Sequence, residues 1–229
     1  MIRIDILVPV FVDLWDEKVL EAAKKVAAPD VDIHICHLEH GVASLESGYD
    51  VAVSGKCVVD KAQELEAQGS QGIVVYCFKD PVIDACKEKL NIPVVGIREA
   101  AIALAGLMGD NIAVITTRKF SVAQYKRVLK GKVHEVTCLD IPVLELGDYE
   151  RVYKTLDERV GQVAAKGSDI VVLGCGSILN LDFHSIEEKY GIPIVLPVYA
   201  GVIACEFMVR TGLKQSRIAY PIPDEKEFR

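Results

Sequence analysis

The apolar run Gly72-Ile-Val-Val-Tyr-Cys77 is followed by a helical segment and then by Asn91-Ile-Pro-Val-Val95. A second stretch repeats this pattern: Asp169-Ile-Val-Val-Leu-Gly-Cys175, a helical segment and Gly191-Ile-Pro-Ile-Val195. Each unit is an apolar strand that ends in cysteine, a helix, and a strand that opens with Ile-Pro. A strand–helix–strand unit that occurs twice predicts two related lobes, each with its own parallel sheet.

Strand and helix patterns alternate along the rest of the chain. Continuous apolar runs predict strands buried on both faces, and apolar residues at helical spacing predict the helices that cover them. The predicted strands are residues 2–8, 31–35, 72–76, 92–95, 112–116, 133–139, 170–173 and 192–196. The predicted helices are residues 17–27, 49–68, 80–90, 99–108, 121–130, 149–165, 183–190 and 202–211. We therefore expect an α/β fold of two pseudo-symmetric lobes, each a parallel sheet flanked by helices.

The boundary between the lobes is expected in the middle of the chain. The first lobe is predicted to span residues 1–97, with the C-terminal helical segment 201–229 returning to it, and the second to span residues 98–200. Two residues are expected to cap helices: Asp80, which precedes a proline, and Ser121, because their oxygens accept from free backbone N–H groups. The active site is expected in the cleft between the lobes.

Composition and charge exclude several classes of protein. The net charge of −7 comes from Lys and Arg scattered among Asp and Glu, which is unfavourable for a nucleic-acid partner. The longest apolar runs, such as that in residues 99–108, are shorter than a membrane span. The seven cysteines are odd in number and include no Cys-x-x-Cys pair, which favours neither a disulfide framework nor a zinc ribbon. The first residues enter a strand pattern without a signal-peptide layout, so we expect a cytoplasmic protein that acts on a small molecule.

Two of the cysteines stand where chemistry is expected. Ligands of parallel α/β sheets bind beyond the carboxyl ends of the strands, and Cys77 and Cys175 both lie there. Two lobes facing one cleft place one thiol on each wall, which suits a racemase: one group removes a proton from a stereocentre and the other returns it on the opposite face. A thiol needs activation for this role, and backbone N–H groups stabilise a thiolate.

Small and polar residues follow the second cysteine and a neighbouring strand. Gly176 and Ser177 leave backbone N–H groups free, and these suit the oxyanion that forms when a carbonyl becomes an enolate. Thr116 and Thr117 close another strand and offer hydroxyls at the same rim. Ordinary turn and cap roles explain these residues equally well.

The motifs Cys77-Phe-Lys-Asp-Pro81 and Leu173-Gly-Cys-Gly-Ser177 resemble the two cysteine motifs of the aspartate/glutamate/hydantoin racemase superfamily, especially its hydantoin and allantoin racemase branch. Residues 41–50, 115–117 and 192–197 are similar to further segments of that branch. The resemblance covers nearly the whole chain. It implies a homo-oligomeric racemase without cofactor or metal that acts on a carbon next to a carbonyl, with 5-substituted hydantoins as the leading substrates.

The same resemblance implies roles for individual residues. Cys77 and Cys175 are the expected acid and base of the reaction. The expected substrate-binding residues are Pro9, Ser44, Phe78, Thr116, Thr117, Gly176 and Ser177.

The sequence departs from the branch at two places. Val8-Pro9-Val10 stands where the branch has an Asn-Pro-Asn loop, and Val82 stands where glycine usually follows the first cysteine motif. Because the amide groups are replaced by aliphatic ones, we expect a preference for substrates with an apolar substituent.

Other candidate residues have simpler explanations. His34, Cys36, His37 and His40 form a histidine-rich segment, but only His34 and Cys36 share a strand face, which disfavours a metal site. His184 is expected to be a solvated residue in the first turn of a helix. The remaining cysteines stand at apolar positions where packing is the expected role: Cys57, Cys86, Cys138 and Cys205.

Several other functions stay open at this point. Amino-acid racemases of the Asp/Glu type and maleate-type isomerases of the same superfamily use related sites, whereas the paired cysteines disfavour an arylmalonate decarboxylase, which needs only one. A catalytically silent small-molecule-binding module and a thiol-based redox protein are alternatives of other classes. Tight binding without proton exchange would identify the module, and ready formation of a disulfide would identify the redox protein.

Overall fold

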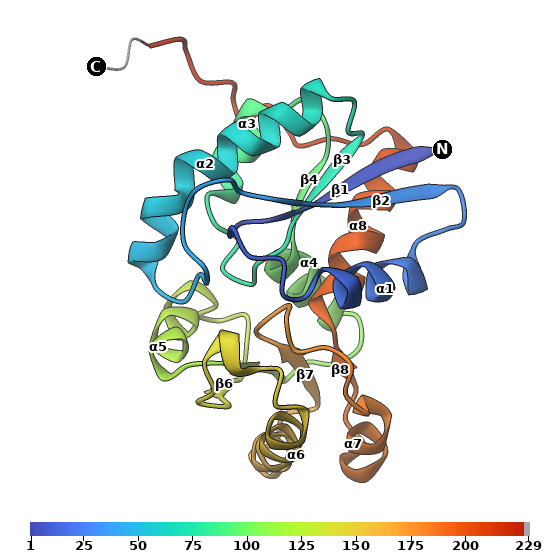
Figure 1. Cartoon of the computed structure of the whole chain (residues 1–229). Coiled ribbons are helices and arrows are strands. Elements are labelled where there is room, and N and C mark those ends of the chain that lie inside the picture. Colours follow the sequence, from blue (N-terminus) through green and yellow to red (C-terminus); the bar gives the residue numbers. More distant parts are fainter. Residues whose placement is uncertain (227–229) are drawn as a thin grey trace.

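Two parallel four-stranded sheets form the framework of the computed structural model, which describes residues 1–226 (Figure 1). The first sheet has the order β2-β1-β3-β4 and the second has the order β6-β5-β7-β8, with parallel pairing of neighbours throughout. The first sheet consists of β1 (Ile2–Val8), β2 (Val31–His37), β3 (Gly72–Val75) and β4 (Val94–Gly96). The second consists of β5 (Ile112–Thr116), β6 (Glu135–Cys138), β7 (Ile170–Leu173) and β8 (Ile194–Val195). Both sheets follow one strand order, so the expected α/β fold with two lobes is confirmed.

Helices flank the sheets. They are α1 (Asp16–Val26), α2 (Gly48–Ala67), α3 (Ile83–Lys89), α4 (Ile97–Ala105), α5 (Lys119–Val128), α6 (Tyr149–Ala165), α7 (Phe183–Tyr190) and α8 (Pro197–Thr211), with a 3-10 turn η1 (Val143–Glu145). Local chemistry fixes several ends: Ser47 and Asp50 form a capping box at the start of α2, and Gly212 ends α8 in the left-handed conformation. Within residues 1–226, none of the helices combines the length and the apolar character that crossing a membrane requires.

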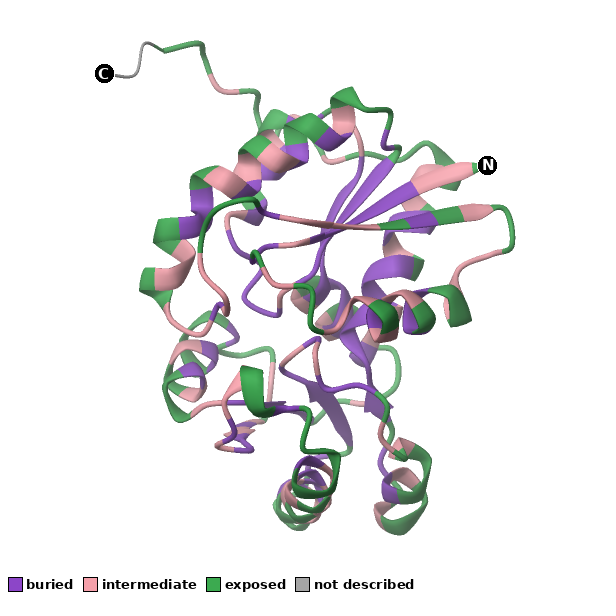
Figure 2. Cartoon of the chain, viewed as in Figure 1, coloured by how far each residue is buried: buried purple, intermediate pink, exposed green. Residues whose placement is uncertain are grey.

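Alternation along the strands separates the two faces of the first sheet. Ile4 and Ile6 of β1 join the large core that contains residues of α1 and α8, whereas Leu7 joins the core beneath α2 and α3. Side chains of a strand point alternately to opposite faces, so a fully apolar strand fills both cores. Figure 2 shows the central strands as buried and the outer faces of the helices as exposed.

Helix α8 returns from the second lobe to the first sheet. It contacts β1, β3 and β4 and packs beside α1 and α4. A Cβ atom at Gly72 of β3 would lie 2.6 Å from the Sγ atom of Cys205 on α8, so the glycine permits this close approach. The proposed division into residues 1–97 with 201–229 and residues 98–200 stays a prediction, and residues 227–229 lie outside the described part of the chain.

Two cap predictions are wrong. Asp80 has a positive φ of 45°, α3 begins only at Ile83, and the Asp80 carboxylate accepts from the N–H groups of Arg98 and Glu99, each at 3.0 Å. Asp80 therefore caps α4, where Gly96 leaves the space that the carboxylate fills. Ser121 lies inside α5, and its hydroxyl donates to the backbone carbonyl of Glu46 at 3.3 Å.

Candidate active site

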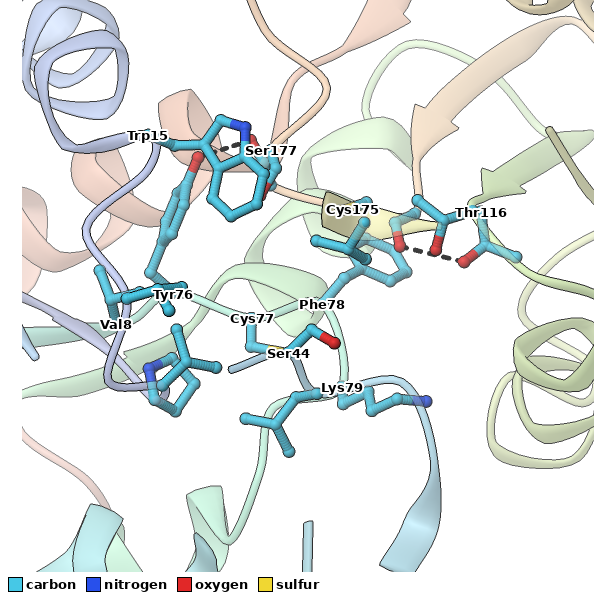
Figure 3. Close-up of a pocket in the computed structure, with 18 of the residues that line it drawn as sticks. Val8, Trp15, Ser44, Tyr76, Cys77, Phe78, Lys79, Thr116, Cys175 and Ser177 are labelled. Atoms are coloured by element: carbon cyan, nitrogen blue, oxygen red, sulfur yellow. Dashed lines mark hydrogen bonds between the residues drawn. The ribbon is translucent and has the colours of Figure 1, made fainter. Parts of the chain in front are cut away.

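A cavity lies between the lobes at the carboxyl ends of the strands. It encloses about 710 Å³ between atoms, part of it open to solvent, and residues that follow β1, β3, β5 and β7 line it. All nine residues expected to act in catalysis or substrate binding border this one cavity (Figure 3): Pro9, Ser44, Cys77, Phe78, Thr116, Thr117, Cys175, Gly176 and Ser177. The structure thus brings the expected site residues together, and their chemical roles stay predictions.

Cys77 lies just beyond β3 in a tight turn. Its N–H donates to the carbonyl of Val75 at 3.1 Å, and its carbonyl accepts from the N–H of Asp80 at 2.8 Å. The pKa of the Cys77 thiol is raised to about 12, mainly by burial and to a smaller extent by the negative charges of Cys175 and Asp80. The backbone N–H and the ammonium group of Lys79 act in the opposite direction.

Cys175 occupies the corresponding position beyond β7. Burial raises the pKa of its thiol, and the charge of Glu46 adds to that effect. The backbone N–H groups of Ser177 and Ile178 and the hydroxyl of Ser177 lower the pKa by stabilising the thiolate. The turn that follows the second cysteine therefore places hydrogen-bond donors beside its thiol.

The two thiols influence each other electrostatically across the cavity. A negative charge on Cys175 raises the pKa of Cys77, so ionisation of one thiol disfavours ionisation of the other. One thiolate facing one thiol is the protonation state that transfer of a proton from one face of a carbon to the other requires.

Direct contacts between the lobes surround the cysteines. The hydroxyl of Tyr76 donates to the carbonyl of Gly176 at 2.5 Å, and a Cβ atom at Gly176 would lie 2.8 Å from the Tyr76 ring. The rings of Phe78 and Tyr125 meet edge to face with centroids 5.3 Å apart. The carboxylate of Glu46 accepts from the N–H of Val143 at 3.0 Å. These contacts hold the walls of the cavity together.

Thr116, the last residue of β5, and Thr117, which follows it, are buried residues that border the cavity. Thr116 donates its hydroxyl hydrogen to the carbonyl of Gly174 at 3.2 Å, so it fixes the turn that leads to Cys175. A Cβ atom at Gly174 would lie 2.9 Å from the Cβ of Thr116, which explains the small residue there. Thr117 borders the cavity beside it.

Much of the cavity lining is apolar. Its aliphatic and aromatic lining consists of Val8, Val10, Val12, Trp15, Val19, Leu45 and Val143. Sequence reasoning noted Val8 and Val10 but missed Trp15 and Val143, as well as Tyr76, Lys79 and Tyr125. Residues 9–11 form a bend after β1, and Pro9 lines the cavity together with the valines on either side of it.

The histidine-rich segment does not gather around a common centre. His37 contacts both carboxylate oxygens of Asp16 at 2.8 Å, and His34 contacts Asp32 at 2.8 Å on the exposed surface. Within residues 1–226, no group of three His, Cys, Asp or Glu side chains is arranged to hold a metal ion. His184 is exposed on α7 and does not line the cavity.

The remaining cysteines pack in the cores. Cys86, Cys138 and Cys205 are buried, and Cys57 is partly buried against the core beneath α2 and α3.

Comparisons with known proteins agree with this geometry. The model of the Asp/Glu/Hydantoin racemase family matches residues 17–205. A hydantoin racemase of Pseudomonas sp. (strain NS671) is 29% identical over 90% of this chain and 86% of its own, and one of Rhizobium meliloti is 31% identical over 78% of each chain. The solved structure of allantoin racemase from Klebsiella pneumoniae superimposes with a TM-score of 0.92 at 28% identity, covering 100% of this chain and 96% of that one.

Proposed function

Because this chain belongs to the Asp/Glu/hydantoin racemase family and is a racemase of that superfamily, we propose that it inverts C5 of 5-substituted hydantoins through Cys77 and Cys175, without a cofactor. The observation that carries the proposal is that these two cysteines, one from each lobe, line a single cavity. The hydantoin and allantoin racemases among its relatives support the substrate class.

The proposed reaction is a pair of proton transfers. The thiolate of one cysteine takes the proton from C5, and the electron pair of that C–H bond moves toward the C4 carbonyl oxygen to give an enolate. The thiol of the other cysteine then gives its proton to the opposite face of C5. The cysteines exchange their protonation states in one turnover, so the reverse reaction uses the same pair with the roles reversed.

Groups beside the cysteines support the charged species. Donors that stabilise an oxyanion belong near the carbonyl oxygen on which charge develops, and the turn of Gly176 and Ser177 borders the cavity next to Cys175. The Thr116 hydroxyl already donates to Gly174, so we assign it to holding the turn rather than to the oxyanion.

The lining of the cavity supports a preference within the hydantoins. Val8, Val10 and Trp15 present apolar surface where the branch has an Asn-Pro-Asn loop. An apolar substituent at C5 is stabilised there by the hydrophobic effect, whereas a polar one loses hydrogen bonds to water that the valines do not replace. We expect faster turnover of hydantoins with aliphatic or aromatic substituents than of allantoin, whose substituent is polar.

The test is deuterium incorporation at C5 of single-enantiomer hydantoins in D₂O. The wild type is compared with Cys77→Ser and Cys175→Ser, and spontaneous exchange is subtracted with an enzyme-free control. We expect the wild type to exchange and racemise and each variant to lose racemisation.

Two other results would identify another function. Turnover of aspartate, glutamate or maleate with inert hydantoins would assign the chain to another activity of the superfamily. Tight binding of a hydantoin without exchange at C5 would identify a catalytically silent binding module.

A further inference from the structure

Lys79 is a buried cation on the wall that carries Cys77 (Figure 3). Its side chain is 5% exposed, and its ammonium group contacts only neutral partners: the amide oxygen of Gln124 and the face of the Tyr125 ring, whose centroid is 5.3 Å away. Within residues 1–226, Lys79 forms no ion pair with a carboxylate. Lysine is seldom buried without a counter-charge, so this position calls for an explanation.

The anion with the largest effect on the pKa of Lys79 is the thiolate of the cysteine two residues earlier. The backbone N–H of Lys79 stabilises the Cys77 thiolate, and the Lys79 ammonium group lowers the pKa of that thiol. The interaction is reciprocal, since a charged Cys77 raises the pKa of Lys79 while burial lowers it. A proton leaving Cys77 thus gives the buried cation a further negative charge to stabilise.

Other charges facing this pair come from several elements. Asp50 and Glu46 raise the pKa of Lys79 from the start of α2 and the loop before it, and Arg98 of α4 lowers it. Asp80 and Cys175 oppose ionisation of Cys77. The charge of Lys79 favours the thiolate of Cys77 against these two opposing charges.

We propose that Lys79 is a positioning residue whose charge stabilises the Cys77 thiolate. It acts whenever Cys77 is unprotonated, which is before Cys77 takes a proton in one direction of racemisation and after it gives one in the other. The inference rests on the proposed function for its place in the cycle. Gln124 and Tyr125 keep the ammonium group at the cavity wall without neutralising it, which leaves its charge for the thiolate. The corresponding support at Cys175 comes from neutral donors of Ser177 and Ile178, whereas Cys77 has the charge of Lys79 in addition to a backbone N–H.

The test measures the Cys77 thiolate without any substrate. Iodoacetamide alkylation of Cys77 is followed by peptide mass spectrometry against pH in a Cys175→Ser background, with Lys79→Met, Lys79→Arg and, as a matched loss of one exposed positive charge, Lys130→Gln. We expect Lys79→Met to lower the alkylation rate about tenfold at neutral pH, which corresponds to one pKa unit. Lys79→Arg and Lys130→Gln should keep rates close to that of the background.

The outcomes separate this proposal from the proposed function. An unchanged pH profile for Lys79→Met would overturn the role of Lys79 even when the wild type racemises hydantoins. A shifted profile supports the electrostatic role whichever substrate the wild type turns over. Thermal unfolding of each variant is compared first, and Lys79→Gln replaces Lys79→Met should the latter fail to fold.

Discussion

The hydrogen bond from Tyr76 to the carbonyl of Gly176 joins the residue before one cysteine to the residue after the other. Tyr76→Phe removes the hydroxyl and keeps the ring. Within residues 1–226 no other donor reaches that buried carbonyl, so the variant leaves it without a partner. An unsatisfied buried acceptor costs about 2 kcal/mol of unfolding free energy, which lowers the Tm of a protein of this size by about 4–8 °C.

The same change is expected to slow racemisation. The hydrogen bond constrains the turns that carry Cys77 and Cys175, and proton transfer to opposite faces of one carbon depends on the separation of the two thiols. Loss of the constraint should lower kcat about tenfold or more, because displacements near 1 Å are costly in catalysis. Stability is measured by urea and thermal unfolding, and kcat by polarimetry on a single-enantiomer hydantoin.

Tyr125→Phe is the matched control. Tyr125 is as deeply buried as Tyr76 and borders the same cavity, but its hydroxyl makes no hydrogen bond with another group in residues 1–226. Its removal should therefore change stability and kcat much less. Equal losses in the two variants would refute the reasoning, because the hydrogen bond would then contribute nothing beyond the volume of a hydroxyl group.

Three further predictions follow from the cavity and its supports. Because burial raises the pKa of Cys77 to about 12, kcat/KM in the direction that uses its thiolate should rise through about pH 7–9, and a plateau near neutrality would contradict this. Val8→Asn combined with Val10→Asn should shift the preference from 5-benzylhydantoin toward allantoin, as measured by the ratio of their kcat/KM values; an unchanged ratio would place specificity elsewhere. Asp80→Ala removes the acceptor of two N–H groups at the start of α4 and should lower the unfolding free energy by about 1–2 kcal/mol in urea titrations, whereas an unchanged midpoint would deny Asp80 its capping role.

The sequence predicted most strongly those elements whose pattern is purely local. The strands at residues 2–8, 112–116 and 170–173 have the predicted bounds, because each is dominated by large apolar and β-branched residues that favour a strand. The start of α8 was wrong by several residues: the helix begins at Pro197, inside a continuous apolar stretch that has no helical periodicity to read. Asp80 was assigned to the nearest helix, whereas it caps one that begins 17 residues later, at Ile97.

The residues of the candidate site likewise divide into those that local sequence predicts and those that depend on long-range contacts. The cysteines and the turn after Cys175 were found because they stand at strand ends, which is a local feature. The partner of Tyr76 lies 100 positions away, and the partner of Lys79 lies 45 positions away on another element. Such contacts depend on how the lobes pack, and nothing in the neighbouring residues reveals them.

Residues recognised from local sequence and residues defined by long-range contacts account for different parts of the proposed function. The cysteines at equivalent strand ends supply one proton donor and one acceptor, and this arrangement follows from the strand order that both sheets follow. Tyr76 and Lys79 break that symmetry, since Leu173-Gly-Cys-Gly-Ser177 has glycine where the first motif has Tyr76 and serine where it has Lys79. The first cysteine thus has a backbone N–H and a buried cation beside it, whereas the second has the neutral donors of Ser177 and Ile178. Salt screens exposed charges strongly, buried charges much less, and neutral hydrogen-bond donors hardly at all. The rate of racemisation should therefore depend little on ionic strength in either direction of the reaction. A strong salt dependence in the direction that uses Cys77 as base would indicate that solvent ions reach Lys79 during turnover.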